Sequence, residues 1–149
     1  SNFNRILETY KKSILYGTIF MATCGIFIFF SADYIMYFFS DDEEIIFYGS
    51  TYLKIAAFAG PCYPIFFISS ALLQGLKKPN YQMIINLMRM IVLPIGALSI
   101  AVVYLNVEFA TMFLVILTIN YIFAASVYKF SIYQISLLQK NYKPNFDAV

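Results

Sequence analysis

Apolar residues dominate four stretches of the chain, and each stretch is long enough to form a helix that crosses a lipid bilayer. The stretches are 13–39, 52–76, 81–104 and 109–128. At a rise of about 1.5 Å per residue, roughly 20 helical residues match the roughly 30 Å of a hydrocarbon core. The polar connectors are short, so consecutive helices should run antiparallel. The pattern predicts an all-α polytopic membrane protein with four transmembrane helices in an up-down bundle.

Polar segments mark the ends of these stretches. Residues 1–12 are typical of a polar, helix-prone lead-in, and residues 129–140 of an amphipathic tail that lies on or leaves the cytoplasmic surface. Ser40 followed by Glu43 fits a capping box, with Ser40 as the cap of the next helix. Asn106 and Glu108 mark the last outer turn.

Prolines predict bends within the second and third spans. A helix that opens at Asp41 and continues to Leu76 would be about 54 Å long, too long to cross a bilayer upright. Proline removes a backbone donor and kinks a helix, so we expect conformational kinks in these two spans. The expected positions are Pro61, which follows Gly60, then Pro64 and Pro94.

Composition and charge agree with a membrane protein. The 149 residues are 61% hydrophobic and 12% charged, and the net charge of +2 is too small to indicate a nucleic-acid partner. Bases precede the first span, fill the second connector and follow the fourth span, whereas the first and third connectors carry only acids. Cytoplasmic segments retain Lys and Arg, so we expect a multi-pass cell-membrane protein with both termini in the cytoplasm.

The few polar residues inside the spans are the candidates for function. Gln82, Asn86 and Arg89 follow at i, i+4 and i+7, so they share one face of the third helix. Two interpretations stay open for this face. It is either the wall of a cavity open to the cytoplasm, or Arg89, about 12 Å into the span, snorkels to the inner headgroups. Gln74 belongs to a second polar patch, near the inner end of the second span.

Three other residues within the spans are expected to have structural roles. Lys54 lies near the outer end of its span and is expected to pair with Asp33, Glu43 or Glu44. Cys24 and Cys62 fall mid-span and are expected to be small apolar fillers.

No pattern for catalysis or for a bound cofactor is present in the sequence. The chain has no histidine, no nucleophile beside a base and no phosphate-binding glycine loop. The acids 41–44 are better explained by a solvated helix start than by a metal site. We therefore expect neither an enzyme nor a bound metal or other cofactor.

Three motifs follow one another along the chain: Phe38-Phe39-Ser40-Asp41-Asp42-Glu43-Glu44-Ile45, Tyr52-Leu53-Lys54-Ile55 and Ser70-Ala71-Leu72-Leu73-Gln74-Gly75-Leu76-Lys77-Lys78-Pro79. Pro61 lies between the last two motifs, and the series Asn86…Arg89…Leu93-Pro94 comes after them. In this order the motifs resemble the multidrug and toxic compound extrusion (MATE) family, over about Leu7 to Tyr128. Those transporters have two six-helix lobes, and each lobe carries this order across its third to fifth helices.

The resemblance implies that the chain is the last four helices of the C-terminal lobe, with upstream helices of the same transporter and the lipid bilayer as its partners. It implies export of small organic, often cationic, compounds by alternating access, driven by Na⁺ or H⁺. Gln82, Asn86 and Arg89 would then face the cavity between the lobes, with Gln74 at its inner edge. Some members place a coupling acid on the helix that corresponds to 52–76, but this stretch has no Asp or Glu. The coupling site is therefore expected in the N-terminal lobe.

Three other classes of membrane protein share parts of this pattern. A lipid-linked oligosaccharide flippase of the same superfamily shares the architecture but often has more cationic cavity residues than one arginine. Small four-helix multidrug exporters depend on a glutamate in the first membrane helix, and 13–39 has none. A non-transporting four-span structural protein shares the expected topology but usually has large outer loops with paired cysteines. The flippase and the structural protein stay open as alternatives.

Overall fold

The computed structural model describes residues 2–105 and 108–142, and in these residues the chain is all-α. The predicted fold class, an all-α polytopic membrane protein, is confirmed. Asn106, predicted to mark the last outer turn, lies outside the described residues. The elements are α1 (Asn2–Phe39), α2 (Glu43–Ala59), α3 (Cys62–Gly75), α4 (Pro79–Leu87), the π-helical η1 (Met88–Val92), α5 (Leu93–Ser99), the π-helical η2 (Ile100–Leu105) and α6 (Phe109–Tyr142).

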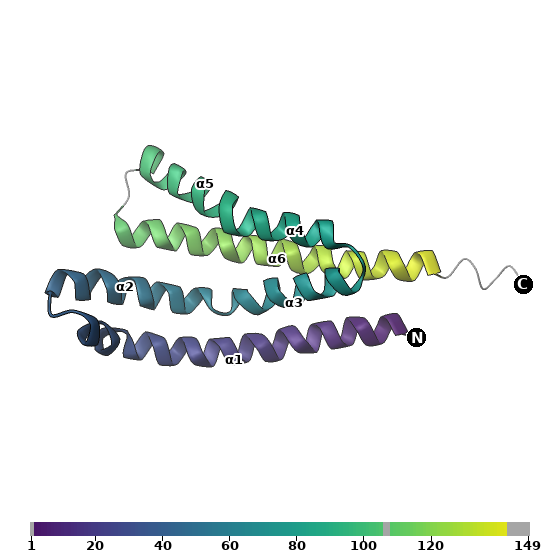
Figure 1. Cartoon of the computed structure of the whole chain (residues 1–149), viewed down its shortest axis with the longest axis horizontal. Helices are drawn as coiled ribbons and strands as arrows, with labels where there is room; N and C mark the ends of the chain where they lie inside the picture. Colours follow the sequence, from purple (N-terminus) through teal and green to yellow (C-terminus); the bar gives the residue numbers. More distant parts are fainter. Residues whose placement is uncertain (1, 106–107, 143–149) are drawn as a thin grey trace, which may run out of the picture.

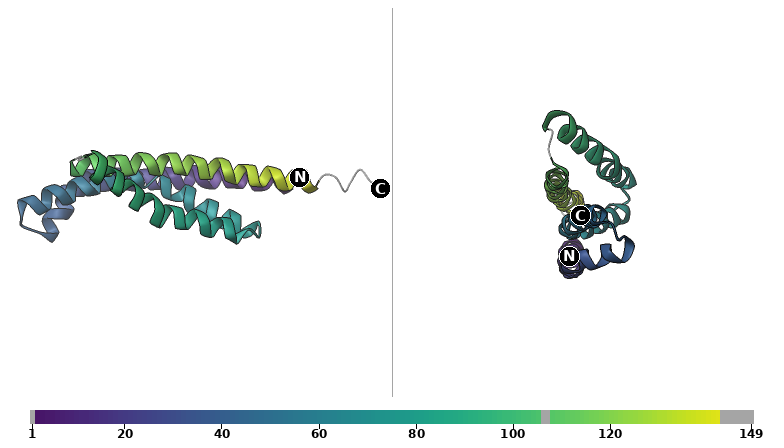
Figure 2. Two further views of the ribbon diagram at one scale, coloured as in Figure 1. Left: turned by 90° about the horizontal axis from the view of Figure 1, so that it is seen from above. Right: turned by 90° about the vertical axis from the view of Figure 1, so that its left-hand side faces the viewer.

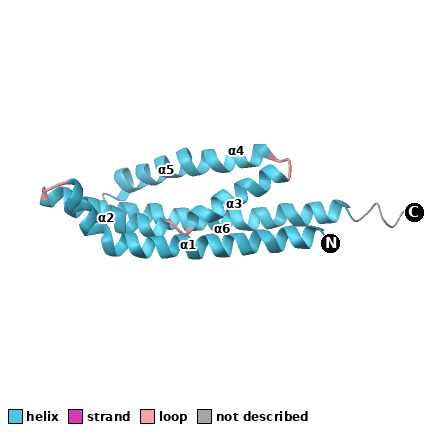
Figure 3. Ribbon diagram, turned by 60° about the horizontal axis from the view of Figure 1, so that its bottom comes forward, coloured by secondary structure: helices cyan, strands magenta, loops and turns pink. Residues whose placement is uncertain are grey.

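The helices run up and down side by side in an elongated bundle (Figure 1). The α2–α3 pair lies between α1 and α6, and α4–α5 packs on the other side of α6. Seen end-on, α1 and α5 lie at opposite edges of the bundle (Figure 2). Loops are confined to the bundle ends and to the junction of α2 with α3 (Figure 3).

Among the described residues, three helical stretches are long and apolar enough to cross a membrane: α1, Pro79–Ser99 and most of α6. The α2–α3 pair makes a fourth if it is counted as one bent span. Their outward faces carry large exposed apolar side chains, such as those of Phe27, Phe30 and Met90. Such faces are typical of helices surrounded by lipid or by other membrane helices.

The start of α2 differs from the predicted capping box. Asp42, not Ser40, is the N-cap, and its carboxylate accepts a hydrogen bond of 2.9 Å from the backbone N–H of Glu44. Ser40 Oγ instead accepts the N–H of Asp42 at 3.1 Å. The ionised acid at the cap carries a charge that the helix dipole favours, which the serine does not.

The helix α2 ends where Gly60 and Pro61 interrupt the hydrogen-bond pattern, and α3 continues at an angle of 46°. Backbone carbonyls freed by such a break need new partners in a membrane. The hydroxyl of Tyr121 on α6 donates to the carbonyl oxygen of Phe58. A neighbouring helix therefore supplies a hydrogen-bond donor to one backbone carbonyl at the bend.

A second interruption precedes Pro94, where η1 replaces regular α-helix. Pro94 has no N–H to donate to the carbonyl of Met90, and the N–H of Leu93 reaches back to the carbonyl of Met88. This bond spans five residues, the pattern of a π-helix, which is a common response to a break in the hydrogen-bond ladder.

Two helices extend beyond the predicted spans at the end of the bundle that holds the α3–α4 turn. The residues before 13, predicted to be helix-prone, are the first turns of α1, and α6 continues unbroken through 129–142. The two extensions pack together because Tyr10, Ile14 and Ile135 form one buried apolar cluster. The rings of Tyr10 and Tyr128 stack with centroids 5.8 Å apart.

Candidate functional site

A cavity of about 260 Å³ lies between α3, the η1–α5 region and α6. The bend at Pro61 and the π segment before Pro94 both border it, so the two interruptions of regular helix meet at this place. Most of the lining is apolar or aromatic, and the polar exceptions are Cys62, Arg89 and Asn120. The lining residues are Ala59, Cys62, Tyr63, Phe66, Arg89, Met90, Pro94 and Asn120.

Arg89 is held against aromatic rings of α3. Its guanidinium carbon lies 5.1 Å from the ring centroid of Phe66, 5.4 Å from that of Phe67 and 5.6 Å from that of Tyr63. A guanidinium over a ring face is attracted by the ring quadrupole. The three rings therefore fix the position of this cation.

These contacts place the Arg89 side chain beside α3. Antiparallel α3 and α4 meet at the turn between them, so Phe66 and Arg89 are similarly far along the chain from that turn. Tyr63 lies one helical turn further from it. The Arg89 side chain therefore packs against the part of α3 that lies opposite its own position, and the two interpretations of its role stay predictions.

Gln82 and Asn86 do not share the Arg89 cavity. They line a separate open groove of about 400 Å³, together with Met83, Leu87, Met90 and Ile91. Asn86 Oδ1 accepts a hydrogen bond of 3.5 Å from Ser70 Oγ on α3. Gln74 is exposed near the end of α3 and borders neither space. The structure thus keeps Gln82 with Asn86, and separates Arg89 and Gln74 from them.

The three prolines occupy different settings. Pro61 lies at the 46° bend, Pro94 follows the π segment, and Pro64 is buried within the first turn of α3. A Cβ added to Gly17 would come within 2.9 Å of Pro64 Cβ, so α1 approaches α3 closely at this point. Pro64 therefore contributes to helix packing as well as to the start of α3.

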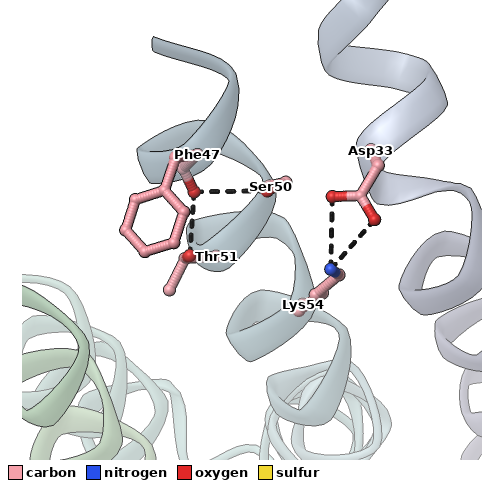
Figure 4. A network of polar contacts seen from close by, with 5 residues as sticks. All are labelled: Asp33, Phe47, Ser50, Thr51 and Lys54. Carbon is pink, nitrogen blue, oxygen red and sulfur yellow. Dashed lines mark hydrogen bonds and ion pairs between the residues drawn. The ribbon is translucent and has the colours of Figure 1, made fainter. Parts of the chain in front are cut away.

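Lys54 pairs with Asp33, one of the three partners expected for it. Its Nζ lies 3.1 and 3.2 Å from the two carboxylate oxygens, and the pair links α2 to α1 (Figure 4). Ser50 and Thr51, on the same helix, both donate to the carbonyl oxygen of Phe47. Both side chains of the ion pair are partly exposed, so this is a surface contact between helices.

The cysteines and acids show no metal-binding arrangement in the described part of the chain. Cys24 and Cys62 are both free thiols. Within residues 2–105 and 108–142, no three His, Cys, Asp or Glu side chains are grouped closely enough to hold a metal ion. Cys62 is buried at the α2–α3 bend and lines the Arg89 cavity.

Sequence reasoning missed Asn120 and the rings around Arg89. Asn120 is an isolated amide in an apolar span, and that isolation was a usable signal. Its Nδ2 donates to the carbonyl oxygen of Ile116 at 3.0 Å. The sequence did not single out the three rings as partners of Arg89, because aromatic residues make up 19% of the chain.

The comparison with protein families gives the assignment. A family model described as MatE matches residues 1–98, which is most of α1 to α5. The chain belongs to the MATE family. It is therefore a multi-pass membrane protein from a family of transporters. No curated protein and no solved structure matches the chain.

The MATE match covers less of the chain than the motifs suggested. It begins before Leu7 and ends at residue 98, so it includes the cap region, the α2–α3 bend and the Gln82–Arg89 segment. The resemblance expected over 99–128 stays a prediction.

Proposed function

We propose that the chain forms the last four helices of the C-terminal lobe of a MATE transporter. The transporter would export small organic, often cationic, compounds by alternating access, using a Na⁺ or H⁺ gradient. The MatE match over residues 1–98 is the observation that carries this proposal. The partners are then the lipid bilayer and the remaining helices of the same transporter.

The distribution of charge supports an orientation with both helical ends of the chain in the cytoplasm. The start of α1, the α3–α4 turn and the end of α6 lie at one end of the bundle (Figure 1). This end carries most of the bases, whereas the acids 41–44 and Glu108 lie at or near the opposite turns. Because cytoplasmic segments retain Lys and Arg, the basic end is proposed to face inward.

The groove lined by Gln82 and Asn86 is the proposed contribution to the substrate pathway. Polar side chains in membrane helices usually face a wet cavity or another helix. Gln82 and Asn86 are half-buried on an otherwise apolar surface, and Ser70 extends this polarity onto α3. Gln74 would lie at the inner edge of the pathway.

The coupling carboxylate is proposed to lie outside this chain. The stretch 52–76 has no Asp or Glu, and Asp33 is already engaged by Lys54 at the opposite end from the α3–α4 turn. The bends at Pro61 and Pro94 would let the lobe change shape as the two lobes rock.

The proposal is tested by transport in proteoliposomes with the complete transporter that contains this segment. A fluorescent organic cation should leave the vesicles, or be driven across them, when a Na⁺ or H⁺ gradient is imposed. Asn86→Leu and Gln82→Leu should reduce this transport. The 149 residues alone should not transport, because an incomplete lobe encloses no pathway. Absence of cation transport under both gradients would overturn the proposal.

The groove itself is tested by thiol labelling in the complete transporter without its native cysteines. Cysteines at 82 and 86 should react with a water-soluble thiol reagent added from the cytoplasmic side. Ile84, which borders α6 instead of the groove, provides the control position. Equal labelling at 82, 84 and 86 would show that this face is not the wall of a water-filled pathway.

A further inference from the structure

The cavity beside Arg89 contains a positioned cation without a counter-ion. Over residues 2–105 and 108–142, the ion pairs join Lys12 to Glu8 and Lys54 to Asp33, both away from Arg89. In the same part of the chain, Arg89 Nε is buried and has no hydrogen-bond partner. Arg89 as a whole is half-buried, and a charged group inside a membrane protein is normally paired or hydrogen-bonded. An anionic group is therefore the missing complement at this place.

Three aromatic rings surround the guanidinium of Arg89, and within the described residues its Nε has no hydrogen-bond partner. Phe66, Phe67 and Tyr63 attract the guanidinium through its charge and polarizable plane. They offer no carboxylate or carbonyl acceptor to its N–H groups. A guanidinium donates in its own plane, in a fork that matches the two oxygens of a carboxylate. The rings thus position the guanidinium but accept no hydrogen bond from its N–H groups.

The remaining lining suits an apolar body attached to the anion. Ala59, Phe66, Met90 and Pro94 present apolar surface to the cavity. Its volume of about 260 Å³ equals roughly nine waters at about 30 Å³ each, enough for one or two aromatic rings. Asn120 also lines the cavity and has a second amide N–H besides the one donated to Ile116.

We infer that this cavity binds the carboxylate of an organic monoanion whose body is one or two rings in size. Arg89 receives the carboxylate, and the apolar lining receives the rings. A phosphate headgroup fits less well, because Arg89 is the single basic residue of the lining. The inference is separate from the proposed export of cations and from ion coupling.

Binding is measured with 2-naphthoate on the purified complete transporter in detergent. This segment has no Trp, and naphthoate fluoresces at wavelengths where Tyr does not absorb, so its anisotropy reports binding to a Trp-free version of the protein. The anisotropy should rise to saturation with wild-type protein. Arg89→Gln should weaken binding at least tenfold, and Arg89→Lys, which keeps the charge but loses the fork, should weaken it less.

Competition keeps the test independent of how well the variants fold. In the wild type, benzoate should displace 2-naphthoate, whereas the neutral benzamide should not. Equal displacement by both would show that the charge is irrelevant and would overturn the inference. Equal displacement by inorganic phosphate would overturn the preference for a carboxylate with an apolar body. Unchanged affinity in a folded Arg89→Gln variant would exclude Arg89 as the receiving group.

Discussion

The hydroxyl of Tyr10 on α1 lies 2.7 Å from Ser69 Oγ on α3 and joins two helices that are 59 residues apart in sequence. Tyr10 is 3% exposed and Ser69 is fully buried, so water does not compete for this hydrogen bond. The fully buried Ser131 of α6 lies beside the same hydroxyl. Three helices therefore meet at a small polar centre within the apolar inner end of the bundle.

Tyr10→Phe should lower the free energy of unfolding by about 1 kcal/mol, because it removes a buried hydrogen bond and leaves Ser69 unpaired. The free energy of unfolding of each variant is measured by reversible unfolding in mixed micelles. Tyr16→Phe is the matched control, because Tyr16 lies on the same helix and is 68% exposed. An equal effect of both substitutions would show that the Tyr10 hydroxyl contributes nothing specific.

Gly25 should tolerate no side chain, because α1 and α2 approach closely at this position. A Cβ at Gly25 would lie 2.7 Å from the backbone carbonyl oxygen of Ala57, and a backbone atom can yield only if α2 shifts. Gly25→Ala should therefore destabilise the chain by about 1–3 kcal/mol, as overpacking does.

The control for Gly25 is Gly96→Ala in α5. No atom lies within 4 Å of a Cβ at Gly96, so the added methyl should be neutral or stabilise the helix by about 0.5–1 kcal/mol. Both variants are compared by unfolding in the same mixed micelles. A loss of stability at Gly96 as large as that at Gly25 would contradict the explanation by close helix approach.

The membrane character of the chain could be predicted from the sequence because hydropathy is a property of long segments. The stretches 13–39 and 81–104 agree with α1 and α4–η2 to within a few residues at their outer ends. The break at Gly60 and Pro61 was also predictable, because proline acts on its own helix. These features depend on local composition and covalent geometry, which a single sequence contains.

The candidate site was harder to predict because it depends on contacts between helices. The spacing of Gln82, Asn86 and Arg89 assumed one regular helix, but η1 begins at Met88 and Arg89 turns toward Phe66 of α3. The difference at the N-cap has a local cause: Ser40 and Asp42 both offer an acceptor at the same helix start, and Asp42 is the one that caps α2. Helical periodicity contains neither the π segment nor the identity of the facing ring.

The ion pair between Lys54 and Asp33 should contribute little to stability despite its short distances. Both side chains are partly exposed, with 35% and 52% of their surface accessible, so solvent and salt screen their attraction. A double-mutant cycle with Lys54→Met and Asp33→Asn should give a coupling near the limit of detection. The coupling should vanish in about 1 M NaCl, where the Debye length is about 3 Å. A large coupling that persists in salt would indicate that the pair is shielded in the assembled transporter.

Pro94→Ala should convert η1 into regular α-helix. The alanine supplies the N–H that Pro94 lacks, and the carbonyl of Met90 is its acceptor in a regular helix. Hydrogen–deuterium exchange should then show a protected amide at position 94 and slower exchange through 88–93. Pro79→Ala is the control, because Pro79 starts α4, where no donor is missing from the helix. If Pro94→Ala leaves exchange through 88–93 unchanged, the packing of Arg89 on Phe66, rather than the proline, holds the π segment in place.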